Sequence, residues 1–207
     1  MTGGETAANR AGTKGVPREQ REQQILDIAT AEFGDRGYAN ASLADIASAA
    51  GVSKPLIYTY FGSRDGLHAA CVRRAGDGLV AAVAAAQGVP GASGRALATL
   101  SGIFTALDGR TQNWRVIYDQ TLPRPSAAFD HARGYQEALN GMGASGVDEV
   151  LDAAGVSAPE DHSLLLAWWF SIVSTTISWW REHPGYTPEQ MTEHCLRVFT
   201  AIRQPSP

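Results

Sequence analysis

The 207-residue sequence predicts an all-α fold, and three observations lead to this class. Apolar residues recur every three or four positions, which is the spacing of a buried helix face. No segment alternates convincingly between apolar and polar residues, as a half-buried strand would. Glycine and proline interrupt the pattern at intervals that suit helices of ordinary length. Because 44% of the residues are hydrophobic and the formal net charge is only −4, the chain can bury a core and global disorder is excluded.

The length allows one large domain or two small ones, and the cysteine content and the amino end indicate where in the cell the protein is expected. Cys71 and Cys195 lie far apart without a CxxC spacing, so we expect a reducing compartment and neither a disulfide nor a metal site. The amino end lacks the apolar stretch of a secretory signal, which makes the cytoplasm the expected location. The uncharged run from His162 to Trp180 is long enough for a membrane span, but its serines and threonines favour a helix buried in a core or an interface.

Charge is distributed unevenly along the chain. Up to Ala75 there are nine Lys and Arg against eight Asp and Glu, and after it eight against thirteen. Neither half is basic enough to indicate nucleic-acid binding by itself, because a local patch is hidden in such an average. Residues 1–17 are expected to form a flexible arm, and the basic residues of this end, Arg10, Lys14, Arg18 and Arg21, either reach DNA phosphates or belong to a solvated tail.

The first expected helix begins near Arg18. Ile25, Ala29 and Phe33 form one apolar stripe at helical spacing. Gly37 ends this helix, because glycine accepts the backbone conformation that terminates helices.

Three serines mark the beginnings of the next helices. Ser42 is the expected N-cap of a short second helix that ends at Gly51. Ser53 caps an even shorter third helix, which ends at Gly62. Ser63 then caps a fourth helix.

Two short helices joined by a glycine-centred turn are typical of a helix-turn-helix, although plain helical packing units share the pattern. The run SLADIASAAGVSKPLIYTYFGSRDGL, residues 42–67, resembles the helix-turn-helix of the tetracycline-repressor (TetR/AcrR) family of transcriptional regulators. The matching landmarks are the Ser42 cap, the segment Ile46 to Ser53, the aromatic pair Tyr58 and Phe61, and the closing pair Arg64 and Leu67.

The resemblance implies a division of the chain. Residues 18–78 would form an N-terminal three-helix helix-turn-helix DNA-binding domain, preceded by the arm at 1–17. Residues 79–207 would form a helical domain for ligand binding and dimerisation. Double-stranded DNA with a palindromic operator is the implied partner, because two reading helices related by a two-fold axis match such a site.

The resemblance also implies which residues meet the DNA: Ser42, Ser53, Lys54, Pro55, Leu56, Tyr58, Thr59, Tyr60 and Arg64. Base edges would be read from the third helix, where Lys54 suits guanine and Leu56 or Pro55 suits thymine methyl groups. The serine and tyrosine hydroxyls would contact phosphates or the groove wall. Tyr60 and Arg64 replace the family's common histidine and lysine, and both keep a phosphate donor.

The second part of the chain is expected to be helical throughout. The expected helices lie near 63–87, 93–107, 112–121, 126–154, 161–182 and 188–203. The glycines in 126–154 predict that this helix is kinked or divided. The helices near 161–182 and 188–203 are the expected homodimer interface, because the first is apolar on too many faces for a surface helix; the family resemblance indicates the same pair.

Large apolar residues in this part are candidates for a small-molecule cavity: Phe104, Trp114, Ile117, Tyr118, Phe129, Met142, Trp168 and Phe170. The alternative for each is ordinary core packing. Such a cavity would favour a largely apolar or aromatic ligand, with Gln112, Asn113 or Arg115 available to orient it.

The expected function is that of a sequence-specific DNA-binding transcriptional regulator, namely a homodimeric repressor that a small molecule releases from its operator. The alternatives are control by a protein partner, no effector at all, or activation of transcription. Catalysis is not expected, because the sequence holds no nucleophile motif, phosphate loop, HExxH or paired-carboxylate signature. No cofactor and no metal are expected either.

Overall fold

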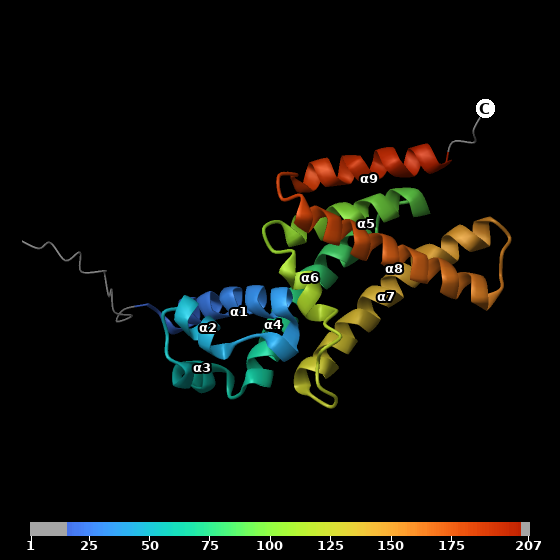
Figure 1. Ribbon diagram of the computed structural model, residues 1–207. Coiled ribbons are helices and arrows are strands. Elements are labelled where there is room, and N and C mark those ends of the chain that lie inside the picture. Colours follow the sequence, from blue (N-terminus) through green and yellow to red (C-terminus); the bar gives the residue numbers. More distant parts are fainter. Residues whose placement is uncertain (1–15, 204–207) are drawn as a thin grey trace, which may run out of the picture.

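The computed structural model describes residues 16–203, and every regular element in that range is a helix (Figure 1). The predicted all-α class is therefore confirmed. The helices are α1 (Arg18–Asn40), α2 (Leu43–Ala49), α3 (Lys54–Phe61), α4 (Arg64–Ala86), α5 (Ala92–Leu107), α6 (Gln112–Ile117), α7 (Ala127–Ala153), α8 (Pro159–Glu182) and α9 (Pro188–Arg203). Arg10 and Lys14 of the expected arm lie outside the described residues.

Serine caps begin the short amino-terminal helices, as the sequence predicts. The hydroxyls of Ser42, Ser53 and Ser63 each accept the backbone N–H three residues further on, at 3.2, 3.3 and 2.8 Å. Each bond satisfies a backbone donor that the first turn of a helix leaves open. The positions of α2, α3 and α4 thus follow from local sequence.

Helical geometry in α1 breaks at Gly37, the predicted end of the helix. Its φ of 73° and ψ of 162° lie outside the range of side-chain-bearing residues. The helical turns before Gly37 bury Ile25, Ala29 and Phe33, which are at most 1% exposed. The predicted stripe is therefore the face by which α1 enters the core.

Two later helices differ from their predictions. The helix expected over 112–121 stops at Ile117, because Asp119 turns the chain by accepting the N–H groups of Thr121 at 2.8 Å and of Tyr38 at 2.6 Å. In contrast, α7 runs through its glycines as one helix, so the expectation of a division was wrong. Packing against α4 and α8 supports α7 where its helix propensity is weak.

The fourth helix joins the two parts of the molecule. It packs on α1 and α3 as well as on α5, α6 and α7 (Figure 1). One apolar cluster extends from Ile46 and Ile57 in the short helices, through Leu67 and Leu79 of α4, to Phe104 of α5. The core is therefore continuous, and a movement of α4 would displace the short helices that pack on it.

The last two helices lie on different neighbours, α8 on α7 and α9 on α5. Val173, Ile177 and Trp180 are the buried residues of α8. Across residues 16–203, no helix combines the length and hydropathy needed to cross a bilayer.

Candidate nucleic-acid interface and internal cavity

A tight turn joins α2 to α3. Gly51 takes a φ of 64°, and the Val52 N–H donates to the Ala47 carbonyl at 2.9 Å. Ile46 in α2 and Ile57 in α3 are each 1% exposed, so the core fixes both helices. The two helices therefore form a helix-turn-helix unit with a defined angle, and the outer face of α3 stays open to solvent.

The exposed side of α3 carries several of the predicted DNA-binding residues. Lys54, Pro55, Tyr58 and Thr59 are all exposed and lie within an arc of about 140° at 100° per residue. Leu56 and Tyr60 are half-buried at the edges of this face. The structure thus brings the expected reading residues onto one surface.

The hydroxyl groups around this face differ in how far they are engaged. Those of Ser42 and Ser53 only accept hydrogen bonds, so each keeps a proton to donate. The Thr59 hydroxyl donates to the Pro55 carbonyl at 2.9 Å. The serines are therefore better placed than Thr59 to donate to a phosphate.

Arg18, one of the basic residues at the amino end of the sequence, contributes a charge beside α3. Its guanidinium carbon lies 5.1 Å from the centre of the Tyr60 ring, a cation–π distance. Because Arg18 is exposed in the first turn of α1, it extends the basic character of the α3 face. The signal in the sequence was the basic run at the amino end, but only the fold places one of its members beside Tyr60.

Arg64 is tied into the protein itself. Its Nη2 donates to the carbonyls of Tyr38 and Ala41, the latter at 2.8 Å, and its guanidinium lies 4.6 Å from the centre of the Tyr38 ring. The residue therefore clamps the connection between α1 and α2 to the start of α4. The Nη2 of Arg64, a residue that was expected to contact a phosphate, is thus engaged in hydrogen bonds within the protein.

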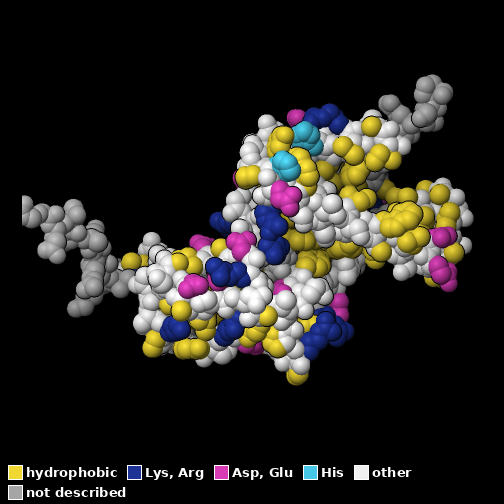
Figure 2. Space-filling view, viewed as in Figure 1, with side chains coloured by type: hydrophobic (Ala, Val, Ile, Leu, Met, Phe, Trp, Pro, Cys, Tyr) yellow, Lys and Arg dark blue, Asp and Glu magenta, His cyan; other side chains and the backbone are white. Residues whose placement is uncertain are grey.

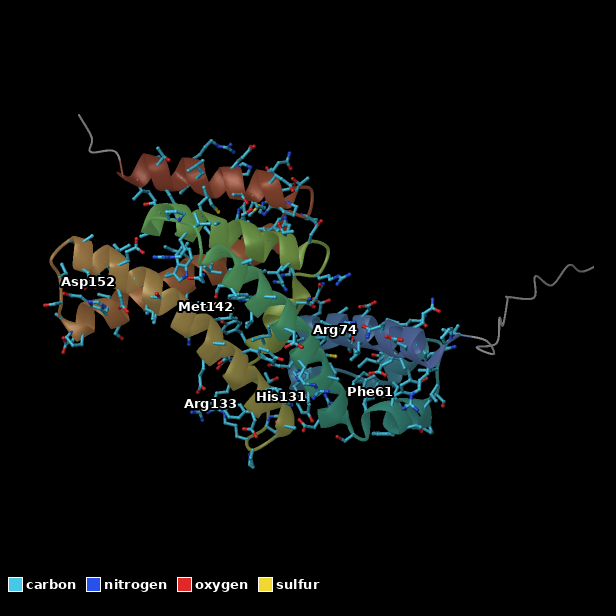
Figure 3. All side chains as sticks on the ribbon, turned by 180° about the vertical axis from the view of Figure 1, so that it is seen from behind. Phe61, Arg74, His131, Arg133, Met142 and Asp152 are labelled. Atoms are coloured by element: carbon cyan, nitrogen blue, oxygen red, sulfur yellow. The ribbon has the colours of Figure 1, made fainter. Side chains whose placement is uncertain are left out.

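A cavity of about 180 Å³ lies between α4, α5, α6, α7 and α8. Its inner end is formed by Ile103, Trp114, Leu139 and Val173, which are at most 5% exposed. Its outer end is formed by part-exposed residues at the carboxyl end of α4, the start of α5 and the last part of α7. Met142, labelled in Figure 3, lines it from the middle of α7. The remaining lining residues are mostly aliphatic or aromatic, so an apolar molecule suits the interior.

Three of the eight predicted cavity residues line it, namely Trp114, Met142 and Phe170. Tyr118 stacks on Trp114 at 4.5 Å and lines two neighbouring surface depressions instead. Burial raises the pKa of its hydroxyl, which has no hydrogen-bond partner.

The other four candidates lie elsewhere, for reasons of packing. Phe104 and Ile117 are fully buried in the core. Phe129 packs on a separate small cluster, with the Arg124 guanidinium 4.5 Å from its ring centre. Trp168 is 57% exposed, because it lies on the opposite side of α8 from Phe170, which lines the cavity. Helical spacing marked these residues as apolar but did not distinguish core, cavity and surface.

The polar residues of the cavity were not predicted. Gln112, Asn113 and Arg115 do not line it, and Arg115 pairs with Asp35 at 3.7 Å. The polar groups present are those of Gln87, Arg95 and Thr99. Arg95, Thr99 and Ile103 follow at intervals of four along α5, a pattern that contained the signal.

Large apolar side chains remain exposed on α8 and α9. On α8 they recur at helical spacing and form one stripe: Leu164, Trp168, Ile172 and Trp179. On α9 they are Leu196, Val198 and Ile202. Figure 2 shows hydrophobic side chains gathered over this part of the molecule. Exposed patches of this kind mark protein–protein contacts more often than free surface.

Comparison with known proteins adds independent evidence on the amino-terminal unit. Residues 25–71 match the family model described as bacterial regulatory proteins, tetR family. The chain is 36% identical over 112 residues to the HTH-type transcriptional activator FasR of Mycolicibacterium smegmatis, a match that covers 54% of this chain and 51% of that protein. The chain thus spans about half the length of this curated relative.

Solved structures extend the likeness to most of the chain. A TetR-like transcriptional regulator from Rhodococcus sp. RHA1 superposes with a TM-score of 0.63 and 28% identity, covering 86% of this chain and 92% of that one. The regulator FadR from Bacillus subtilis, solved in complex with stearoyl-CoA, gives a TM-score of 0.62 at 16% identity and covers 85% of this chain and 96% of that one. At that identity the second likeness concerns the fold alone.

Proposed function

The chain belongs to the tetR family of bacterial regulatory proteins, and we propose that it acts as a homodimer that reads a palindromic operator. We further propose that a small apolar ligand controls its binding to that operator. The observation that carries the proposal is the outer face of α3, where Lys54, Pro55, Tyr58 and Thr59 are exposed on a helix that Ile57 fixes to the core. Lys54 would contact guanine, and Pro55 with Leu56 would contact thymine methyl groups. In this proposal the DNA-binding domain is residues 18–78, with 1–17 as an arm.

The serines and tyrosines at the rim of that face would hold the DNA backbone. Ser42 and Ser53 have hydroxyl protons to donate, and Tyr58 is 45% exposed. Tyr60 would act together with the nearby Arg18. Contacts of this kind set register and affinity but carry no direct sequence information.

Dimerisation would use residues 79–207, through the exposed apolar stripe of α8 and the apolar side chains of α9. Leu164, Trp168 and Ile172 are each more than 40% exposed, which is costly for a helix that stays in water. A second copy related by a two-fold axis would cover both stripes at once and present two α3 helices to successive major grooves.

The cavity is the proposed effector site. It touches α4, the helix that also packs on α1 and α3, so a ligand that shifts α4 would alter the position of the reading helix. The B. subtilis FadR complex with stearoyl-CoA supports an effector with an apolar chain. Such a ligand must bind the DNA-free form more tightly, by about 1.4 kcal/mol for every tenfold loss of operator affinity.

Repression in the cytoplasm is the proposed mode of action, because occupying a promoter needs no contact beyond DNA binding. Activation is the second candidate, and the role of the relative FasR as a transcriptional activator favours it. Control by a protein partner, or the absence of any effector, would apply if the cavity stays empty in all ligand screens.

Selection from a random duplex DNA pool at about 150 mM salt tests the proposal, since non-specific phosphate binding is weak under that condition. Enrichment of an inverted repeat is the expected result. Enrichment of a single half-site would contradict the palindromic dimer, whereas no enrichment by folded protein would contradict sequence-specific reading by the ligand-free form.

A further inference from the structure

Arg95 is the one charged residue that lines the cavity in the described part of the chain. It projects from the first turns of α5, at the outer end of the cavity, and its side chain is 17% exposed. Gly146 of α7, which also lines the cavity, lies close to this side chain; a Cβ added there would be in ordinary van der Waals contact, 3.9 Å from the Arg95 Nε. An arginine thus occupies the junction between an apolar interior and water.

The guanidinium is only partly satisfied. Its Nη2 pairs with Oε2 of Glu149, a carboxylate whose side chain is 43% exposed. Its Nε is buried and has no hydrogen-bond partner. A buried donor without an acceptor is unfavourable, so an incoming acceptor at this place gains an interaction that the free protein lacks.

The start of α5 adds to the positive potential at the same place. Helix α5 begins at Ala92, which lines the cavity, and its N-cap is Gly91, which has no side chain to cap the helix. The positive end of the helix dipole therefore lies near the outer end of the cavity, close to Arg95. Two independent features favour a negative charge there.

Size restricts what such a ligand can be. At about 180 Å³, the cavity is somewhat larger than the engineered cavity of about 150 Å³ that holds benzene. It therefore has room for one ring or a short hydrocarbon chain. The inner residues Ile103, Trp114 and Val173 offer that part no charged partner.

From these observations we propose that the effector is an amphipathic anion whose acidic group binds Arg95 while its apolar part fills the inner cavity. The acidic group accepts from Nε and competes with Glu149 for the guanidinium. Because Glu149 is largely at the surface, it regains water when it is displaced. This inference rests on the proposed function only in taking the cavity as the effector site.

A matched pair of probes separates charge from apolar contact. Octanoate and octan-1-ol share one chain and differ in the head group, so we would titrate each into the full-length protein at pH 7 by calorimetry. Octanoate is expected to bind at least tenfold more tightly. Equal binding of the two, or tighter binding of the alcohol, would overturn the inference while leaving the cavity as a site for neutral effectors.

Variants assign the difference to Arg95. Arg95→Gln should lower octanoate affinity at least tenfold and change octan-1-ol affinity less than twofold, whereas Arg110→Gln, a charge change at an exposed loop residue, should change neither. Glu149→Gln should tighten octanoate binding twofold to fivefold by removing the competitor. An equal loss of both probes in Arg95→Gln would mean a purely structural role.

The outcomes also separate this inference from the proposed function. If Arg95→Gln does not fold, Glu149→Gln still decides, because unchanged octanoate affinity in that variant contradicts competition at the guanidinium. If neither probe binds the wild-type protein, the acidic-ligand inference fails, while selection of an operator from random DNA would still uphold DNA reading.

Discussion

The backbone N–H of Tyr38 donates to the carboxylate of Asp119 at 2.6 Å, which ties the end of α1 to the chain after α6. The two residues belong to different parts of the molecule, since α1 supports the helix-turn-helix and α6 lines the cavity with Trp114. Nearby, Arg115 pairs with Asp35 across the same junction at 3.7 Å. A ligand that moves α6 would therefore pull on α1 directly, in addition to any effect through α4.

We expect Asp119→Ala to lower the free energy of unfolding by about 1–3 kcal/mol, because it removes the acceptor of the Tyr38 and Thr121 N–H groups. Urea denaturation measures this change. Asp108→Ala, which removes an exposed carboxylate from the loop after α5, is the matched control and should stay within about 0.5 kcal/mol. Equal stability of the two variants would show that the junction contributes nothing.

Local sequence predicted the amino-terminal helices well because their boundaries depend on short-range chemistry. Ser42, Ser53 and Ser63 cap helices through bonds to residues three positions away, and Gly51 supplies a positive φ in the turn. A pattern of this kind is visible in any single sequence. The stop of α6 was missed because its cause, Asp119, bonds to Tyr38 more than eighty positions earlier.

The cavity was predicted poorly for a related reason. Helical spacing shows that Phe104, Met142 and Trp168 lie on apolar faces, but it does not show which neighbour covers each face. In the structure these residues are a core residue, a cavity residue and an exposed residue respectively. Arg95 was missed because its spacing to Thr99 and Ile103 indicates a shared helix face but does not show that α7 encloses a cavity against that face.

His68 should make the protein less stable in acid. It is fully buried against the rings of Phe33 and Tyr38, at 4.5 and 5.4 Å between centres, and neither ring nitrogen has a hydrogen-bond partner. Burial lowers its pKa from 6.5 to about 4, although Asp119 and Asp65 oppose the shift. The unfolded chain therefore takes up a proton first, and the stability present above pH 6.5 is lost as the pH falls toward 4.

The size of this effect is measurable by replacing the histidine. Between pH 7.5 and pH 4.5 the wild-type protein should lose about 2–3 kcal/mol more unfolding free energy than His68→Leu does. Urea titrations at the two pH values give the comparison. Parallel pH profiles for the two proteins would mean that His68 can be protonated in the folded state without cost.

Two glycines of α4 should respond oppositely to the same substitution. A Cβ at Gly76 would lie 2.3–2.5 Å from the ring of Tyr135 on α7, whereas a Cβ at Gly78 would meet nothing within 4 Å. We expect Gly76→Ala to destabilise by about 1–3 kcal/mol and Gly78→Ala to stabilise by about 0.5–1 kcal/mol. Thermal unfolding of both variants tests the contact, and stabilisation by both would mean that the Tyr135 ring moves aside freely.

Charge placed on the apolar stripe of α8 should prevent dimerisation. Trp168 is 57% exposed in the centre of that stripe, so Trp168→Glu would bury a carboxylate against the partner's apolar side chains. Sedimentation velocity should give a monomer for this variant and a dimer for Ser163→Glu, which introduces the same charge at an exposed residue on another face of α8. A dimer in both cases would exclude this stripe from the interface.

Substitutions on α3 should separate the reading of sequence from the holding of the DNA backbone. Lys54 is exposed at the start of α3, and Lys54→Ala removes the amine that is proposed to contact guanine, so preference should change at one symmetric pair of operator positions. Tyr60→Phe removes one hydroxyl donor but keeps the ring beside Arg18, so affinity should fall similarly for all sequences. Binding of both variants to a set of single-base operator variants distinguishes the two patterns. An unchanged profile for Lys54→Ala would remove Lys54 from the reading residues, and a loss confined to one base pair for Tyr60→Phe would place its hydroxyl on a base edge instead of a phosphate.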